Sequence, residues 1–353
     1  MKKTLVALAV AAFATSASAL TVYEADGSKV DFDGSIRLRL DNGSTKADGQ
    51  SRVEKHSNLH NDGSRFGVRM KHDIAEDFYA LGRVEFRFDD EATGSDKFGD
   101  LYAKRAYVGL GSKQYGELTF GRQVLIGDDI AQSGFDNAYG TWDTTLATAS
   151  NSAVRYDYKG IEGLQVGLDY RFAEKRNATT NDVETGELKS GYGAGVTYNF
   201  KVAENQAVTV AAGYSRDNYA TGTSTKSHKD AYAAGAKYTV DALTLAADYA
   251  GSFKKTGSEK ERGNAFRVGA KYAVTPAIAV YGNYGHGVVK TKNGSATTQK
   301  DVYDKFMLGT EYKVHKNVFT YLEGSIEKVK TTTATTTSKT KGNNIGVGLR
   351  VNW

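Results

Sequence analysis

The last eight residues of the chain alternate strictly between two kinds of side chain. Apolar residues hold one parity and small or polar residues hold the other: Val347, Leu349, Val351 and Trp353 against Gly346, Gly348, Arg350 and Asn352. Successive side chains of a strand point to opposite faces of a sheet, so this pattern predicts a sheet with different surroundings on its two sides. A closed barrel is the simplest arrangement that leaves such a strand without an open edge.

The same period of two recurs along the chain. It is clearest in residues 30–42, 64–74, 78–90, 164–172, 243–249 and 266–272. The segments with this pattern number about sixteen, and an even number places both ends of a barrel on one side. No segment with a helical period competes with them, and no boundary between domains is visible.

Composition decides between a barrel in water and a barrel in lipid. No run after the amino terminus approaches the roughly 20 apolar residues that a membrane helix needs, and the mean hydropathy is −0.49. A membrane barrel tolerates this value because only every second strand residue meets lipid. The chain has no cysteine, a single proline (Pro276) and 22 tyrosines, and tyrosine is enriched where lipid meets water. We therefore predict an all-β fold, a 16-stranded antiparallel transmembrane β-barrel.

The amino terminus has the organisation of a secretory signal peptide. Lys2 and Lys3 precede a short apolar run at residues 5–13, and small residues at 16–19 follow it. This order of basic, apolar and small residues predicts cleavage after Ala19. The expected organisation is a signal peptide at 1–19 and one barrel domain at 20–353. Removal of two lysines would change the net charge from +5 to 5 − 2 = +3.

The connectors between the predicted strands alternate in length. Short ones fall near residues 75–77, 113–115, 161–162, 241 and 315–317, and long polar ones at 43–61, 125–150, 174–190, 219–229 and 331–341. Short turns on the periplasmic side and longer loops on the outer side are typical of outer-membrane barrels. The low-complexity stretch 331–340 is expected to be a mobile surface loop.

A barrel of about sixteen strands is too wide for side chains to fill, so it holds water or a plug. No plug domain is visible, which predicts a pore. The connector 125–150 is rich in aromatic and acidic residues and is expected to pack inside the barrel. Charged walls select ions in pores. The predicted constriction comprises Arg37, Arg65, Arg69, Arg83, Arg87, Arg105, Asp128, Asp129 and Asp136.

The arginines, together with Arg39, share the parity expected to face the lumen. One alternative is that they form only a solvated face and that the aspartates belong to an exposed loop. The sign of the charge preference also stays open, because a basic wall favours anions and an acidic loop opposes them.

Several short blocks carry a family resemblance. Residues 23–31, 63–67 and 115–123 resemble blocks of the general trimeric porins of Gram-negative bacteria, and 159–164 and 346–350 most closely resemble the major porins of the Pasteurellaceae. The resemblance implies a sixteen-stranded barrel, a homotrimer and a third outer loop folded into the lumen. It also matches Arg65 and Arg105 to basic constriction residues. Ser35 stands where some members have lysine, and 132–140 lacks the family's Pro-Glu-Phe-Gly-Gly.

Arg122 is unusual because Leu118 and Phe120 place it on the apolar parity, where a charge facing lipid is costly. The resemblance implies a role at the subunit interface, with an acidic partner loop that contains Asp89, Asp90 and Glu91. The alternative is that the Arg122 side chain reaches the membrane surface.

The function expected from these features is that of an outer-membrane general porin, a water-filled channel for small hydrophilic solutes and ions. We expect no enzyme activity, cofactor or metal site, and no nucleic acid partner. The expected partners are lipid, lipopolysaccharide and the barrel-assembly machinery, although Trp353 replaces the phenylalanine usual at the family's carboxyl end. The rival functions are a barrel enzyme, an adhesin and a sugar-specific channel with Tyr107 and Tyr281 as stacking residues.

Overall fold

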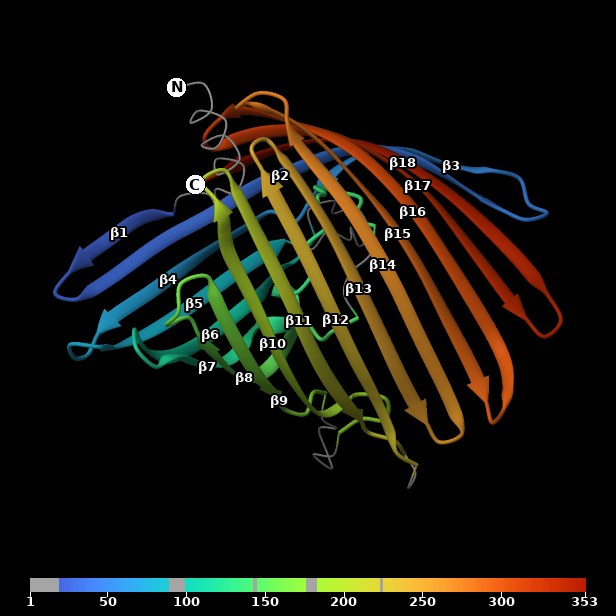
Figure 1. The fold of residues 1–353 in the computed structure, drawn as a ribbon, viewed down its shortest axis with the longest axis horizontal. Coiled ribbons are helices and arrows are strands. Elements are labelled where there is room, and N and C mark those ends of the chain that lie inside the picture. Colours follow the sequence, from blue (N-terminus) through green and yellow to red (C-terminus); the bar gives the residue numbers. More distant parts are fainter. Residues whose placement is uncertain (1–18, 89–98, 142–144, 176–182, 223–224) are drawn as a thin grey trace.

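The computed structural model describes residues 19–88, 99–141, 145–175, 183–222 and 225–353. The expected signal peptide lies outside these residues except for Ala19 and stays a prediction. The described residues form eighteen strands and one 3-10 turn (Figure 1). Their bounds are β1 Leu20–Ala25, β2 Ser28–Ala47, β3 Val53–Asn61, β4 Arg65–Asp73, β5 Phe78–Phe88, β6 Leu101–Ser112, β7 Gly116–Val124, η1 Ile126–Asp129, β8 Ala149–Tyr158, β9 Leu164–Arg171, β10 Leu188–Ala203, β11 Gln206–Tyr219, β12 Ser227–Val240, β13 Leu243–Thr256, β14 Glu259–Ala273, β15 Ile278–Asn293, β16 Ala296–His315, β17 Val318–Thr333 and β18 Thr337–Asn352.

These eighteen segments occupy sixteen places in one closed antiparallel barrel. Residues 28–35 of β2 pair with β4, and residues 38–45 of the same strand pair with β3, so β3 and β4 share one place. On the other edge of β2, β1 pairs with residues 28–32 and β18 with residues 35–47. The pairing of β18 with β2 closes the ring, and the predicted sixteen-stranded barrel is confirmed.

The two faces of the wall differ as the alternation predicts. On β18, Val347 and Leu349 are 49% and 47% exposed, whereas Gly346 and Gly348 are buried. Exposed apolar side chains recur on every second residue of the other long strands, and they form the band that meets lipid. No helix in the described residues is long and apolar enough to cross a membrane.

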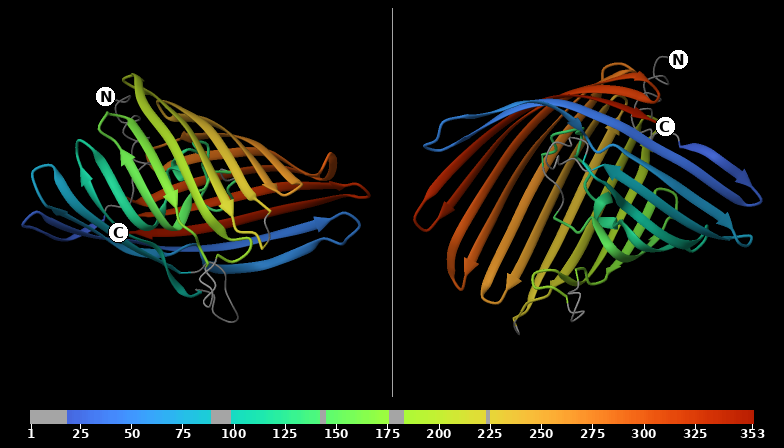
Figure 2. Two further views of the ribbon diagram at one scale, coloured as in Figure 1. Left: turned by 90° about the horizontal axis from the view of Figure 1, so that it is seen from below. Right: turned by 180° about the vertical axis from the view of Figure 1, so that it is seen from behind.

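The wall is taller on one side of the barrel. Strands β4 to β9 have between 8 and 12 residues, whereas β10 to β18 have between 14 and 20. Figures 1 and 2 show the long strands extending beyond the short ones at the end opposite to the short turns. A membrane strand needs only about 9–11 residues, so the tall wall extends past the membrane on its outer side.

This extension changes one expectation from the sequence. Residues 331–340 do not form the predicted surface loop, because β17 runs to Thr333 and β18 begins at Thr337. Thr332 pairs directly with Thr337 across the hairpin. Threonine is β-branched and fits a pleated strand well, so the repetitive composition was a misleading signal for a loop.

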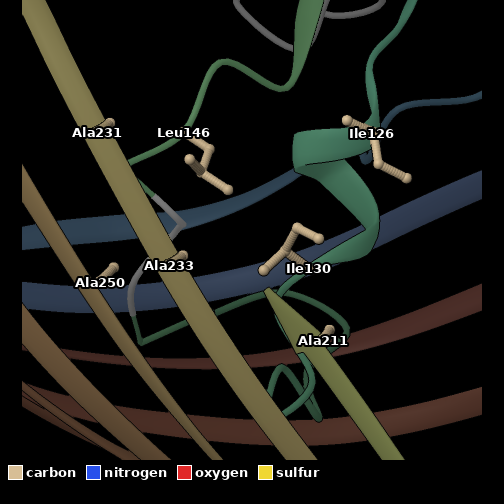
Figure 3. Packing of buried hydrophobic residues seen from close by; sticks show 7 residues of the cluster. All are labelled: Ile126, Ile130, Leu146, Ala211, Ala231, Ala233 and Ala250. Carbon is tan, nitrogen blue, oxygen red and sulfur yellow. The ribbon is translucent and has the colours of Figure 1, made fainter. Parts of the chain in front are cut away.

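A small apolar core joins the segment after β7 to the barrel wall (Figure 3). Ile126, Ile130 and Leu146 pack against alanines of β11, β12 and β13. Glycines on the facing strands make room for them: a Cβ at Gly167 would lie 2.6 Å from Ile126 Cβ, and one at Gly195 would lie 2.8 Å from Ile126 Cγ1. The glycines on this part of the wall therefore allow the segment to approach the strands closely.

Candidate pore constriction

Residues 132 and 133 are bound to the wall through Asp248 on β13. The Asp248 carboxylate accepts the backbone N–H groups of Gln132 at 2.7 Å and Ser133 at 2.8 Å. Arg267 on β14 donates to the same carboxylate at 3.1 Å and to the Ser133 hydroxyl at 2.8 Å. Hydrogen bonds to a charged group contribute about 1.5–3 kcal/mol each. Asp248 and Arg267 therefore fix this part of the segment against the inner wall.

A second attachment is formed by Glu323 on β17, a carboxylate with no exposed surface. It accepts the backbone N–H groups of Asn137, Ala138 (2.8 Å) and Tyr139 (2.9 Å). The Tyr281 hydroxyl also donates to it at 2.7 Å. Tyr281 thus helps to hold the segment, and this contact gives it a role other than that of a sugar-stacking residue. Burial raises the pKa of the Tyr139 phenol to about 12.

Arg350 on β18 links the same segment to the first strands of the barrel. It donates to the Asn137 side-chain oxygen at 3.0 Å and to the Asn137 carbonyl oxygen at 2.5 Å. It also pairs with Asp62 at 3.2 Å. Asp62 in turn accepts from Arg39 at 2.5 Å and from the Tyr321 hydroxyl at 2.8 Å. Residue 137 is therefore held from both sides, by Glu323 and by Arg350.

The arginines predicted to face the lumen lie on neighbouring strands and on the inner face of the barrel. Directly paired residues of an antiparallel sheet point to the same face, and the register shows how the arginines are grouped. The cross-strand pairs are Arg37↔Arg350, Arg65↔Arg87, Arg69↔Arg83 and Glu85↔Arg105. We call Arg37, Arg39, Arg65, Arg69, Arg83, Arg87, Arg105 and Arg350 the arginine wall.

Glu85 is the central carboxylate of the arginine wall and is only 3% exposed. It pairs with Arg83 at 2.9 Å, with Arg87 at 2.7 Å and with Arg105 at 3.5 Å. A buried carboxylate is stable only when cations or donors surround it. The sequence places Glu85 on the inner face but gives no sign that three arginines share it.

Asp33 on β2 is a second carboxylate of the arginine wall. It pairs with Arg69 at 2.8 Å and with Arg83 at 3.0 Å. Arg83 therefore bridges two carboxylates and is nearly buried. Arg83 therefore stabilises the wall, and its charge is less available to passing solutes than that of an unpaired arginine.

Arg37 and Arg65 differ from the other arginines of the wall. Arg37 Nε donates to the Ser35 hydroxyl at 2.8 Å, and Arg65 Nε donates to the Gly63 carbonyl oxygen at 3.0 Å. Among the residues that the structure describes, neither forms an ion pair with a carboxylate. Their positive charge is therefore not neutralised by a bound partner.

The three acidic residues predicted to belong to the constriction have different surroundings. Asp129 pairs with Arg155 of β8 at 3.3 Å, so its ion pair lies away from the arginine wall. Asp136 lies beside its own loop, where a Cβ at Gly140 would be 3.1 Å from Asp136 Oδ2. Asp128 follows immediately after the buried part of η1 and is exposed.

Arg122 of β7 lies on the outward parity. It is opposite Ala106 of β6 and follows Leu118 and Phe120, which are 40% and 44% exposed. Its expected partners Asp89, Asp90 and Glu91 lie outside the described residues. The interface role of Arg122 stays a prediction.

The family model of the Gram-negative porins matches residues 4–333. The chain belongs to this family. Two relatives are similar to it over their whole length and its own: the major outer membrane protein of Pasteurella multocida strain Pm70, 33% identical over 378 residues, and that of Pasteurella multocida, 32% identical over 372 residues. The resemblance to the major porins of the Pasteurellaceae is therefore confirmed.

Solved structures show the same fold. OmpT of Vibrio cholerae in its trimer form aligns with a TM-score of 0.68 at 19% identity, over 93% of this chain and all of that one. OmpF of Salmonella typhi aligns with a TM-score of 0.66 at 17% identity, over 94% of this chain and all of that one. Family and fold together establish a porin of the outer membrane, a channel for passive diffusion of small hydrophilic solutes.

Proposed function

We propose that the arginine wall gives this porin a preference for small anionic solutes. Eight arginines line the wall, and four carboxylates pair with them: Asp33, Asp41, Asp62 and Glu85. The wall thus carries 8 − 4 = 4 net positive charges. Charged rings and walls act on permeating ions at short range, where water screens them least.

The unpaired charges of Arg37 and Arg65 are the observation that supports this preference most strongly. Both are held by hydrogen bonds from Nε to uncharged oxygens, which leaves the other guanidinium nitrogens of each residue available. A guanidinium presents several donors in a fixed plane and suits carboxylate and phosphate groups. Small carboxylates and phosphates are therefore the solutes that this wall would favour.

We further propose that residues 125–141 narrow the channel opposite the arginine wall. Asp248, Glu323 and Arg350 hold the segment against the inner wall at three places. A segment that is attached at three places changes its position little, and a constriction of constant width needs such a segment. In this proposal the positive charges of Arg69, Arg87 and Arg105 attract anions to the narrowest part of the channel. The negative charges of Asp128 and Asp136 weaken that attraction.

The assembly we propose is a homotrimer in contact with outer-membrane lipid. OmpT of Vibrio cholerae is described as a trimer, and Arg122 on the outward face offers a cation for a contact between subunits. Transport by the channel would need neither a covalent step nor a cofactor. Insertion would use the barrel-assembly machinery, with the apolar parity and Trp353 of β18 as its signal.

Liposome swelling tests the charge preference separately from pore size. Liposomes that contain the porin would be placed in solutions of an uncharged and an anionic solute of equal size. We expect faster swelling with the anionic solute, and we expect Arg37→Gln with Arg65→Gln to reduce the difference clearly while uptake of the uncharged solute stays unchanged. Equal rates for both solutes with the wild-type porin would refute the preference.

A further inference from the structure

A lysine recurs near the periplasmic end of four strands of the tall wall. Strands β10, β12, β14 and β16 each lead into a short turn, and each carries a lysine two or three residues before its last residue. These lysines are Lys201, Lys237, Lys271 and Lys313, and we call them the lysine row. A cation at the same height on four alternate strands of a barrel forms part of a ring around its mouth.

Two members of the lysine row lie just below the segment 125–141. Gly235 and Gly269 are in close contact with that segment, since a Cβ at either position would be 2.7 Å from one of its carbonyl oxygens. Lys237 and Lys271 follow these glycines two residues later on the same face of each strand. This spacing places them about 7 Å farther toward the periplasmic turns, at ~3.3 Å per residue.

The other two lysines also face the lumen. Lys201 has the parity of Gly195, an inner-face glycine of β10 that lies against the same segment. Lys313 follows Glu311 at the same parity, and Glu311 reaches across the inner face of β15 to pair with Lys271 at 2.6 Å. All four side chains therefore point into the channel on the periplasmic side of the segment.

The charge of the lysine row is only partly compensated. We consider the lumen-facing residues of β10 to β17 between the segment and the periplasmic turns, with histidine counted as neutral. In these described strands the charged residues of that zone are the four lysines and Glu311. The zone thus carries 4 − 1 = 3 net positive charges.

Two lysines of the row form no ion pair with a carboxylate among the residues that the structure describes, Lys201 and Lys237. Lys201 lies opposite Ala207, and Lys237 lies opposite Thr209. Asp248, the inner carboxylate of β13, already accepts from the segment and from β14. The positive charges of these two lysines are therefore available to ions in the channel.

The lysine row and the arginine wall occupy different parts of the barrel. The arginine wall belongs to β2, β4, β5, β6 and β18, whereas the lysine row belongs to β10 to β16 on the other side of the ring (Figure 2). The row also lies on the periplasmic side of the segment 125–141. An ion that has passed the constriction proposed at this segment therefore meets the lysine row before it leaves the channel.

We propose that the lysine row is a second anion filter at the periplasmic mouth, with Lys201 and Lys237 as its specificity-determining residues. Fixed charges act on ions over a distance that salt controls, about 3 Å at 1 M and about 30 Å at 0.01 M. Dilute salt on the periplasmic side leaves the row unscreened, and concentrated salt there screens it. The row thus makes the strength of ion selection depend on the side that holds the dilute solution. The proposal rests on the anion preference proposed above and adds this dependence to it.

Reversal potentials in planar bilayers test the position of the charge. Potassium chloride at about 1 M and about 0.01 M would face the two sides, and the two solutions would then be exchanged. The variant is Lys201→Gln with Lys237→Gln, which we expect to be less anion-selective than the wild type. Its shift in reversal potential should be at least about twofold larger when the dilute solution is on the periplasmic side, because the row is screened least there.

The matched control removes two lumen-facing lysines from the other side of the segment. Lys229 and Lys254 lie directly opposite each other, and they share the parity of Ala231 and Ala250, which pack against the segment. Lys229→Gln with Lys254→Gln removes the same charge near the outer mouth. Its shift should be larger with the dilute solution on the outer side, the reverse of the result for the lysine row.

The periplasmic side of each recorded channel can be identified chemically. The chain has no cysteine, so Gln114→Cys in the exposed turn after β6 introduces a single thiol. A charged thiol reagent that cannot cross the membrane would change the current only when added from that side. All porins in the comparison carry this substitution, so it does not affect the differences between them.

The outcomes separate this proposal from the anion preference. A shift of equal size in both salt directions, no shift, or the same dependence on side for both lysine pairs would overturn the role of the lysine row. A cation-selective wild type would instead refute the anion preference, while the dependence on side would still be measured. The unfolding temperature of the variant should equal that of the wild type, because neither lysine has an ion pair to lose. If it falls, Lys237→Gln alone should show the same dependence on side.

Discussion

Glu323 of β17 accepts the backbone N–H of Tyr139 at 2.9 Å, which joins residues 184 positions apart in the sequence. The same carboxylate accepts the N–H groups of Asn137 and Ala138. A single buried side chain thus fixes three consecutive residues of the segment that follows β7. The position of the inner segment depends on this contact.

Replacing Glu323 by glutamine should loosen the segment. The amide has a similar size but offers only one acceptor oxygen and no charge, so we expect a loss of about 2 kcal/mol in the free energy of unfolding. Single-channel recordings should show more current noise and more frequent closures. Glu327→Gln on the same strand is the control, because its ion pair with Lys305 is 3.8 Å long and Glu327 is 43% exposed. Equal noise in both variants would contradict the role of Glu323.

The glycine at position 167 should be intolerant of a side chain. A Cβ there would lie 2.6 Å from Ile126 Cβ, so Gly167→Ala must displace the turn η1 and should cost about 1–3 kcal/mol. Thermal unfolding and conductance should both change. In the control Gly324→Ala the nearest atom would be 3.6 Å away, and we expect both measurements to stay close to wild type. A Gly167→Ala porin with wild-type stability would show that the close approach is not required.

Glu85→Gln should reduce stability and strengthen the anion preference. The substitution leaves three arginines without their common carboxylate, and breaking such a buried pair costs about 3–5 kcal/mol. It also raises the net charge of the arginine wall by one. Unfolding in denaturant and ion selectivity measure the two effects. The control Glu54→Gln breaks an exposed pair with Arg52 and should change stability by less than about 1 kcal/mol.

Arg122→Ala should lower the heat stability of the trimer. An outward arginine among apolar residues is costly toward lipid and is better accommodated at a subunit contact. Gel electrophoresis of unheated and stepwise heated samples measures the dissociation temperature. Arg216→Ala on β11 is the control, since Arg216 also faces outward but pairs with Asp230 at 3.1 Å within the same subunit. An unchanged dissociation temperature for Arg122→Ala would remove this residue from the interface.

The period of two made most of the barrel predictable from the sequence. Parity alone assigned Arg37 and Arg65 to the inner face and Val347 and Leu349 to the outer one, because side chains alternate in any strand. The odd or even position of a residue predicts its face only where the pairing between neighbouring strands is regular. The register between β5 and β6 is regular as far as Glu85 and Arg105 and then shifts, so that Ala103 and not Lys104 lies opposite Phe86. No local sequence pattern predicts such a bulge.

Local sequence patterns do not predict the contacts that residues 125–141 make with the barrel wall. Arg350 belongs to the very strand whose alternation is clearest, yet its bond to Asn137 spans 213 positions. The same limit applies to Asp129, whose partner Arg155 lies on β8, 26 positions farther along the chain. Residues far apart in the chain meet here through the closure of the barrel, and no spacing in the sequence encodes that closure.

Ion selectivity tests the role of the arginine wall most directly. The porin would be inserted into planar bilayers between unequal potassium chloride solutions, and the reversal potential measured for the wild type and for Arg37→Gln with Arg65→Gln. The control is Lys339→Gln with Lys341→Gln, which removes the same charge from the outward face. We predict an anion-selective reversal potential for the wild type and the control, and a clear shift toward zero for the arginine variant. A cation-selective wild type, or an arginine variant indistinguishable from it, would contradict the account.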